Sequence, residues 1–258
     1  MNKVLLVTGG ATGIGAATVR LAAATGYDVA IHCHPSRRAE ADGLLESLAG
    51  GATRAIVVEA DVREEDAIQS LFRHVAEKLG PLDALVNCAG IDMPPTPIDA
   101  LQAGQVRSLL EVNVVAVMLC CREAVRRMST RHGGNGGVIV NISSMAATIG
   151  GRPGFAPYAA SKAAIDAFTI GLAREVAGAG IRAIAVRPGV VRTPMTEGHL
   201  AQANFRAAVA ASIPLGRVAE PIEIARPILF ALSGEASFMS GCTLDVSGGG
   251  FRLAGPAE

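Results

Sequence analysis

The amino-acid sequence predicts an α/β fold: a single domain with a doubly wound parallel sheet of about seven strands and helices on both faces. Short β-branched runs alternate with amphipathic stretches from one end of the chain to the other, which is the order of repeated βαβ units. The strand runs are apolar almost throughout, as expected for strands buried on both faces of a sheet. No linker or low-complexity segment interrupts this order, so we expect one domain over residues 1–258.

The first half of the chain contains four expected strands with three helices between them. The opening apolar run at 4–7 is too short for the core of a signal peptide and passes directly into glycines, as a strand that leads into a helix does. The expected elements are a strand over 3–8, a helix over 13–25, a strand over 28–33, a helix over 37–49, a strand over 54–59, a helix over 64–79 and a strand over 82–87.

The second half continues this pattern after a longer helical region at about 101–130, which the Gly-Gly-Asn-Gly-Gly turn at 133–137 ends. The elements expected after the turn are a strand over 138–143, a helix over about 156–177, a strand over 182–187, helices near 199–211 and 221–232, and a strand over 243–246. Residues 193–214 form the only insertion large enough to act as a substrate lid. Since open α/β sheets bind ligands beyond the carboxyl ends of their strands, we expect the site at that edge.

Composition excludes several classes of function. The chain has 23 Lys and Arg against 23 Asp and Glu, and no Lys/Arg-rich run, which argues against a nucleic-acid partner. The longest later apolar stretch, 112–121, contains Asn113 and is flanked by charged residues, so we expect no membrane span. The five cysteines show no CxxC spacing, which favours reduced thiols in a cytoplasmic protein. The five histidines are scattered, and we expect no metal site.

A glycine cluster directly follows the first expected strand and contains Gly9, Gly13 and Gly15. Without Cβ atoms the backbone turns tightly and approaches a pyrophosphate closely, and the helix that begins near Gly13 points its N–H groups at that anion. The alternative is a plain strand-to-helix turn, which the position after the first strand of a βαβ unit disfavours. The cluster therefore predicts a dinucleotide-binding loop.

The end of the second expected strand indicates which dinucleotide binds. An NAD-preferring protein carries an acidic residue there, but this chain reads His-Cys-His-Pro-Ser-Arg-Arg over 32–38 and has no carboxylate before Glu40. Arg37 and Arg38 suit a 2′-phosphate, because a guanidinium pairs well with phosphate oxygens. We therefore expect NADP(H), with His34 and Arg37 as the contacts. If both arginines only occupy a solvated helix start, NAD(H) remains possible.

Further cofactor contacts are expected at the other strand ends. Asp61 can accept from an adenine amino group or cap the following helix, and the sequence leaves both open. The small residues at 88–90 let the backbone pass close to a ribose, and Thr193 lies within reach of a nicotinamide carboxamide. The candidate cofactor-binding residues are Gly9, Thr12, Gly13, Ile14, Gly15, His34, Arg37, Asp61, Val62, Asn87, Ala89, Gly90, Tyr158, Lys162, Pro188, Gly189, Val191 and Thr193.

The candidate catalytic residues centre on the fifth strand and the helix that follows it. Tyr158 and Lys162 are four residues apart and share one helix face. A free tyrosine titrates at about 10, so we expect the Lys162 ammonium and an oxidised nicotinamide to favour the phenolate. Ser144, at the strand end, is placed to hydrogen-bond a substrate oxygen as its charge changes. Asn113 alone reads as a satisfied buried amide, and the joint occurrence adds it to the catalytic set.

As a set, these residues resemble the short-chain dehydrogenase/reductase family over about 4–250. The resemblance rests on T-G-G-A-T-G-I-G at 8–15, N-C-A-G at 87–90 and P-G at 188–189, with Cys88 in place of the family's second Asn. It implies a Rossmann-type fold bound to a nicotinamide dinucleotide. The C-terminal segment 240–250 resembles that of members that assemble as homotetramers.

The resemblance also implies a role for each catalytic candidate. Tyr158 would be the general acid–base and Ser144 the residue that orients the carbonyl; Ser143 is its rival, and alignment on the strand favours Ser144. The interval from Ser144 to Tyr158 is one residue longer than the commonest pattern, which concerns the geometry of the loop between them. Lys162 would bind the nicotinamide ribose and lower the pKa of the tyrosine. Asn113 would hold a water that links Lys162 to bulk solvent.

The sequence therefore predicts a cytoplasmic NADP(H)-dependent oxidoreductase that interconverts a secondary alcohol and a ketone or aldehyde. Thr12 stands where many NADP-dependent members carry a basic residue, so the choice of NADP rests on Arg37 and Arg38. The competing hypothesis is a catalytically silent dinucleotide sensor or scaffold, which the presence of both Tyr158 and Lys162 disfavours. The resembled branch contains sugar dehydrogenases and 3-oxoacyl-thioester reductases, and the sequence leaves these two substrate classes open.

Overall fold

The computed structural model describes residues 2–250, which contain one seven-stranded sheet with all strands parallel in the order β3-β2-β1-β4-β5-β6-β7. The strands are β1 (Val4–Thr8), β2 (Asp28–Cys33), β3 (Ala55–Glu59), β4 (Ala84–Asn87), β5 (Gly137–Ile142), β6 (Ile181–Pro188) and β7 (Thr243–Val246). Each lies within two residues of its expected bounds, and the doubly wound fold predicted from the sequence is confirmed. The domain was expected over 1–258; residues 1 and 251–258 lie outside the described residues.

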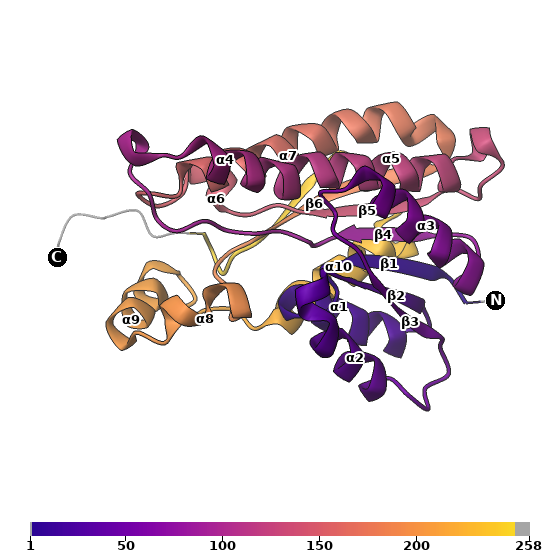
Figure 1. Cartoon of the computed structure of the whole chain (residues 1–258), viewed down its shortest axis with the longest axis horizontal. Coiled ribbons are helices and arrows are strands. Elements are labelled where there is room, and N and C mark those ends of the chain that lie inside the picture. Colours follow the sequence, from indigo (N-terminus) through magenta and orange to yellow (C-terminus); the bar gives the residue numbers. More distant parts are fainter. Residues whose placement is uncertain (1, 251–258) are drawn as a thin grey trace.

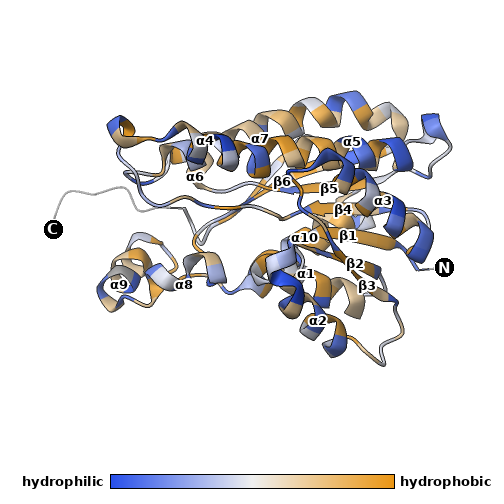
Figure 2. Ribbon diagram, in the orientation of Figure 1, coloured by the Kyte–Doolittle hydropathy of each residue, from blue (hydrophilic) through white to orange (hydrophobic). Residues whose placement is uncertain are grey.

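Helices cover both faces of this sheet. They are α1 (Gly13–Ala24), α2 (Arg38–Ser47), α3 (Glu65–Leu79), α4 (Ala103–Leu110), α5 (Ala116–Met128), α6 (Ala146–Ile149), α7 (Ala156–Val176), α8 (Pro194–Leu200), α9 (Ala203–Ser212) and α10 (Pro221–Leu232). Figure 1 shows α1, α2 and α10 on one side of the sheet and α3, α5 and α7 on the other. Figure 2 shows apolar strands between helices whose outer turns are hydrophilic.

The alternation of side chains along each strand produces the two cores. In β1, Leu5 and Val7 belong to the cluster that includes α1 and α10, whereas Val4 and Leu6 belong to the cluster that includes α3, α5 and α7. Because both faces of each central strand are covered, almost every strand residue must be apolar, and burying one such side chain contributes about 1.5–3 kcal/mol. This is the pattern that identified the strands.

Two of the expected helical regions differ from their bounds, and the short helix α6 was not expected. The region expected over 101–130 is divided by a π-helical turn, η3 (Glu111–Val115), which separates α4 from α5. The single helix expected near 199–211 is instead two helices, α8 and α9. The helical region starts earlier than expected, at Pro194, because the Thr193 side chain forms a capping box with Thr196 and because proline is favoured in a first helical turn.

Helices α8 and α9 lie beyond the carboxyl ends of the strands and away from the two helical layers (Figure 1). They have a small core of their own, made by Leu200, Val209, Ile213 and Val218. The strand order reverses at β1, which pairs with β2 on one side and β4 on the other, and open α/β sheets bind ligands at such a point. No helix within residues 2–250 has the length and apolar character needed to cross a membrane.

Candidate active site

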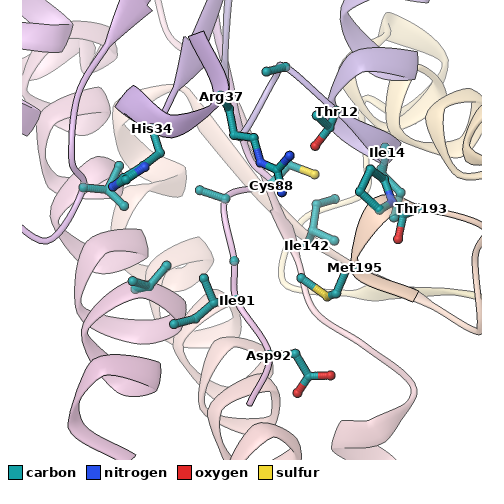
Figure 3. Close-up of a pocket in the computed structure, with 18 of the residues that line it drawn as sticks. Thr12, Ile14, His34, Arg37, Cys88, Ile91, Asp92, Ile142, Thr193 and Met195 are labelled. Carbon is teal, nitrogen blue, oxygen red and sulfur yellow. The ribbon is translucent and has the colours of Figure 1, made fainter. Parts of the chain in front are cut away.

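A cleft of about 650 Å³ opens at the carboxyl ends of the strands, between the sheet and α8. It gathers most of the residues singled out by the sequence, and Figure 3 shows His34 and Arg37 at one end and Asp92 at the other. The predicted residues that line it are Gly9, Thr12, Gly13, Ile14, His34, Arg37, Asp61, Val62, Ala89, Gly90, Ser144, Tyr158, Lys162, Pro188, Gly189, Val191 and Thr193. Three others, Gly15, Asn87 and Asn113, lie behind its wall.

The glycine loop packs so closely that side chains are excluded. Gly9 has a φ of 62°, and a Cβ there would lie 2.8 Å from the Ala89 backbone. A Cβ on Gly15 would lie 2.1 Å from the Gly9 carbonyl oxygen. The start of α1 has neither a side-chain cap from Thr12 nor an acidic residue in its first turn. Its N–H groups and positive dipole end are therefore available to an anion in the cleft.

The end of β2 brings one of the two candidate arginines to the cleft. Arg37 lines it beside His34 and Ser36, and its guanidinium pairs with Glu40 at 2.7 Å. Arg38 does not line the cleft, because its Nε donates to Asp42 on the same helix. Arg38 thus only occupies a solvated helix start, as the alternative interpretation supposed, and of these two arginines it is Arg37 that reaches the cleft.

Asp61 is at the same end of the cleft and is held by Arg63, whose guanidinium donates to both carboxylate oxygens. These hydrogen bonds lower the pKa of Asp61 to about 2. The N-cap of α3 is Glu64, so the interpretation of Asp61 as the helix cap is wrong. Its contact with an adenine stays a prediction.

The catalytic candidates converge at the end of β5. Lys162 Nζ donates to the Ile142 carbonyl at 2.9 Å and lies 5.8 Å from the centroid of the Tyr158 ring. Ser143 is buried, and its Oγ donates to the Lys162 carbonyl at 3.0 Å. Ser144 is partly exposed, accepts the Ala146 N–H at 3.1 Å and hydrogen-bonds Tyr158. Ser144 is therefore the serine that reaches the tyrosine.

Burial dominates the titration of this pair. Burial and, to a smaller extent, the charge of Asp92 raise the pKa of Tyr158, the hydrogen bond with Ser144 opposes them, and together they bring it to about 12. Burial also lowers the pKa of Lys162 to about 8. Burial thus disfavours both charged forms, and the expectation that Lys162 and an oxidised nicotinamide favour the phenolate stays a prediction.

Asn113 is fully buried in the π-helical turn, and its side chain is occupied. Its Oδ1 accepts the Ile91 N–H, its Nδ2 donates to the Ile91 carbonyl, both at 2.9 Å, and Nδ2 also donates to Ser161 Oγ at 3.2 Å. The amide clamps the segment that follows β4 against α7. The interpretation of Asn113 as a satisfied buried amide describes its side chain, and the water-holding role stays a prediction.

The sequence is similar to those of known oxidoreductases over nearly its whole length. The family model described as enoyl-(acyl carrier protein) reductase matches residues 9–250. The uncharacterized oxidoreductase YgfF of Escherichia coli (strain K12) is 40% identical over 249 residues, covering 95% of this chain and 99% of the relative. The cis-4-hydroxycyclohexanecarboxylate dehydrogenase of Sinomonas cyclohexanicum is also 40% identical over 249 residues, covering 96% of each chain. The chain belongs to the short-chain dehydrogenase/reductase family.

A solved structure agrees with this family at the level of the fold. A blue fluorescent protein from a metagenomic library, in complex with NADPH, has a TM-score of 0.87 at 33% identity, covering 96% of this chain and 97% of that one. Members of this family are NAD(P)-dependent oxidoreductases that act on CH–OH groups, and this chain is an enzyme of that kind.

Several residues of this dehydrogenase/reductase site gave no signal in the sequence. His32 is buried, accepts the Gly9 N–H through Nδ1 at 3.1 Å, and is kept neutral by burial, which lowers its pKa to about 4. Asp92 and Met195 line the other end of the cleft. Asp92 forms no recognisable sequence motif with another residue, and only the three-dimensional fold brings it close to Tyr158.

Asn87 and Cys88 end β4 in different environments. Asn87 Nδ2 donates to Asn141 Oδ1 at 2.9 Å and so ties β4 to β5 behind the cleft. The Cys88 side chain faces the cleft, where burial raises the pKa of its thiol to about 11. Within residues 2–250, no three His, Cys, Asp or Glu side chains come together in a way that could hold a metal ion.

Proposed function

We propose that this protein is an NADP(H)-dependent oxidoreductase that interconverts a secondary alcohol and a ketone or aldehyde by hydride transfer. The observation that carries the proposal is one continuous cleft with Arg37 and the glycine loop at one end and Tyr158, Ser144 and Lys162 at the other. The relatives support it, since one is named a dehydrogenase of a hydroxycyclohexane compound. A solved relative bound to NADPH supports the choice of dinucleotide.

The cleft fits this cofactor at three places. The uncapped start of α1 would hold the pyrophosphate, and the absence of Cβ atoms at Gly9 and Gly13 leaves room for its close approach. Arg37 and Ser36 would hold a 2′-phosphate, provided that the Arg37 guanidinium exchanges Glu40 for it. Lys162 would contact the nicotinamide ribose. When bound, the nicotinamide supplies or accepts the hydride.

The protein's own residues handle the proton. With a pKa of about 12, Tyr158 is a phenol at neutral pH and holds the proton that a carbonyl oxygen must receive during reduction. Ser144, hydrogen-bonded to Tyr158, would donate to the same oxygen and orient it. After reduction, a protonated Lys162, held by the Ile142 carbonyl, would stabilise the phenolate that results. In the oxidative direction the phenolate form of Tyr158 would take the hydroxyl proton through Oη and become the phenol again.

We extend the proposal to the assembly and the lid. Residues 193–214 would cover the substrate, since Thr193, Pro194, Met195 and Thr196 already form one wall of the cleft at the start of α8. We further propose that the protein is a homotetramer in the cytoplasm, as the sequence predicts.

The test is cofactor oxidation followed at 340 nm, with NADPH beside NADH, against acetoacetyl thioesters, small diketones, aldoses and steroid ketones. The expected result is turnover of at least one class with a lower KM for NADPH than for NADH. A lower KM for NADH would refute the choice of NADP and make Arg37 a surface charge. Tight NADPH binding with no turnover of any carbonyl would support the sensor hypothesis instead.

A further inference from the structure

The catalytic end of the cleft contains a carboxylate that the proposed mechanism does not use. Asp61 and Asp92 are the two acidic residues among the described lining residues, and Asp61 is at the far end with Arg63. Asp92 is partly buried, and its Oδ1 accepts the Met93 N–H at 2.8 Å. The Met93 N–H occupies Oδ1, and His199 and Lys162 act on the carboxyl group through their charge, so Oδ2 can accept a bond from a ligand.

Asp92 is close to the reacting group and held rigidly. Its charge acts on both Tyr158 and Lys162 and raises the pKa of each. It directly follows Ile91, whose backbone N–H and carbonyl are both bound by the Asn113 amide. A substrate whose oxygen lies on Tyr158 therefore brings its neighbouring atoms within reach of a carboxylate that is fixed in position.

The side chains around Asp92 determine whether a substrate group beside it must be a hydrogen-bond donor. The other side chains at this end include the apolar Ile91, Ile142 and Met195, which offer no hydrogen-bond donor (Figure 3). An ionised carboxylate only accepts hydrogen bonds, and burial, which raises the pKa of Asp92, makes an unpaired charge there costly, so a substrate that supplies a donor is favoured. A sugar, polyol or hydroxy ketone supplies an O–H there. A 3-oxoacyl thioester supplies a second carbonyl oxygen, which is another acceptor.

We propose that Asp92 is a specificity-determining residue that accepts a hydrogen bond from a second hydroxyl group of the substrate. The enzyme then prefers vicinal diols and hydroxy ketones to simple alcohols, and disfavours 3-oxoacyl thioesters. This inference rests on the proposed function and decides between the two substrate classes that the sequence left open.

The experiment compares kcat/KM for cis-cyclohexane-1,2-diol and cyclohexanol with NADP⁺, in wild type, Asp92→Ala and Asp92→Asn. The expected preference for the diol in wild type is about 10- to 100-fold, the size of a hydrogen bond to a charged group. The preference should fall to near 1 in Asp92→Ala and to an intermediate value in Asp92→Asn, whose amide oxygen still accepts. Asp99→Ala, an exposed carboxylate on the same connection, should keep the wild-type ratio.

A binding measurement makes the result independent of turnover. The diol is titrated calorimetrically into the NADP⁺ complexes of Tyr158→Phe and of Tyr158→Phe with Asp92→Ala, and the second Kd should be at least about 10-fold higher. An equal preference in wild type and Asp92→Ala, equal Kd values, or better use of an acetoacetyl thioester than of 2-hydroxycyclohexanone by wild type would overturn the proposal. Turnover of cyclohexanol and the diol at equal rates would overturn it and leave the proposed function standing. If neither alcohol is oxidised, the proposed function is in question and the titration decides the role of Asp92.

Discussion

Replacing Asn113 by alanine tests how the π-helical turn supports the active site. The substitution removes the amide that accepts the Ile91 N–H and donates to the Ile91 carbonyl and to Ser161. A hydrogen bond of this kind contributes about 1 kcal/mol net, so the loss of three predicts a fall of about 3 kcal/mol in the free energy of unfolding. For a domain of this size that corresponds to a decrease of about 6–12 °C in Tm.

The assay is thermal unfolding followed by circular dichroism, beside the KM for the substrate. The KM should rise with the loss of Tm, because Ile91 joins Gly90 to Asp92 in the cleft wall. Asn135→Ala is the matched control: Asn135 is exposed in a turn, and its substitution should change the stability by less than about 0.5 kcal/mol. Asn113→Asp should destabilise at least as much as Asn113→Ala at pH 8, because an ionised oxygen would then face the Ile91 carbonyl. An Asn113→Ala protein with the Tm of wild type would refute the reasoning.

Three further predictions concern the cofactor end and the buried lysine. Arg37→Ala should raise the KM for NADPH at least about 10-fold in initial-rate assays and leave the KM for NADH unchanged, because only NADPH carries the 2′-phosphate. Gly15→Ala should abolish NADPH binding in a fluorescence titration, since its Cβ would lie 2.1 Å from the Gly9 carbonyl oxygen. Lys162→Met should have a higher Tm than wild type below pH 8, and this difference in Tm should disappear as the pH rises to about 10.5. Burial lowers the pKa of Lys162 from 10.5 to about 8, so in that window the unfolded wild-type chain binds more protons and wild-type stability rises with pH.

Each of these predictions has a distinct contradicting result. Equal rises in KM for both cofactors would mean that Arg37 acts on the shape of the loop and not on a phosphate. Normal NADPH affinity in Gly15→Ala would mean that the loop can yield by more than 1 Å without losing the anion site. A Tm difference between Lys162→Met and wild type that is the same at pH 7 and pH 10 would mean that the lysine is not desolvated as its burial indicates.

The sheet was predictable because its signal is local. A strand buried on both faces must be apolar at nearly every position, and a run such as Val4–Thr8 shows this without any knowledge of its neighbours. The π-helical turn at Glu111–Val115 and the division between α8 and α9 were missed. The first depends on packing around the Asn113 amide, and the second on a cap in which Thr193 and Thr196 bind each other.

The site was predictable in its residue types and less so in its electrostatics. The spacing of Tyr158 and Lys162 placed both on one helix face, and the structure has them 5.8 Å apart, from Nζ to ring centroid. The effect of burial, which raises the pKa of Tyr158, was not predicted, since spacing carries no information on depth of burial. Asp92 was missed for a related reason: its importance comes from the three-dimensional approach of the β4 end to α7, which no sequence interval records.

The central claim is that Tyr158 moves the proton while the rest of the cleft holds the cofactor. The most direct test is Tyr158→Phe, in which the phenol oxygen is removed and the ring that packs beside Lys162 is kept. The account predicts NADPH affinity within about 3-fold of wild type and a kcat reduced at least about 100-fold, the lower end of the contribution of a general acid. Near-wild-type turnover by Tyr158→Phe would contradict it.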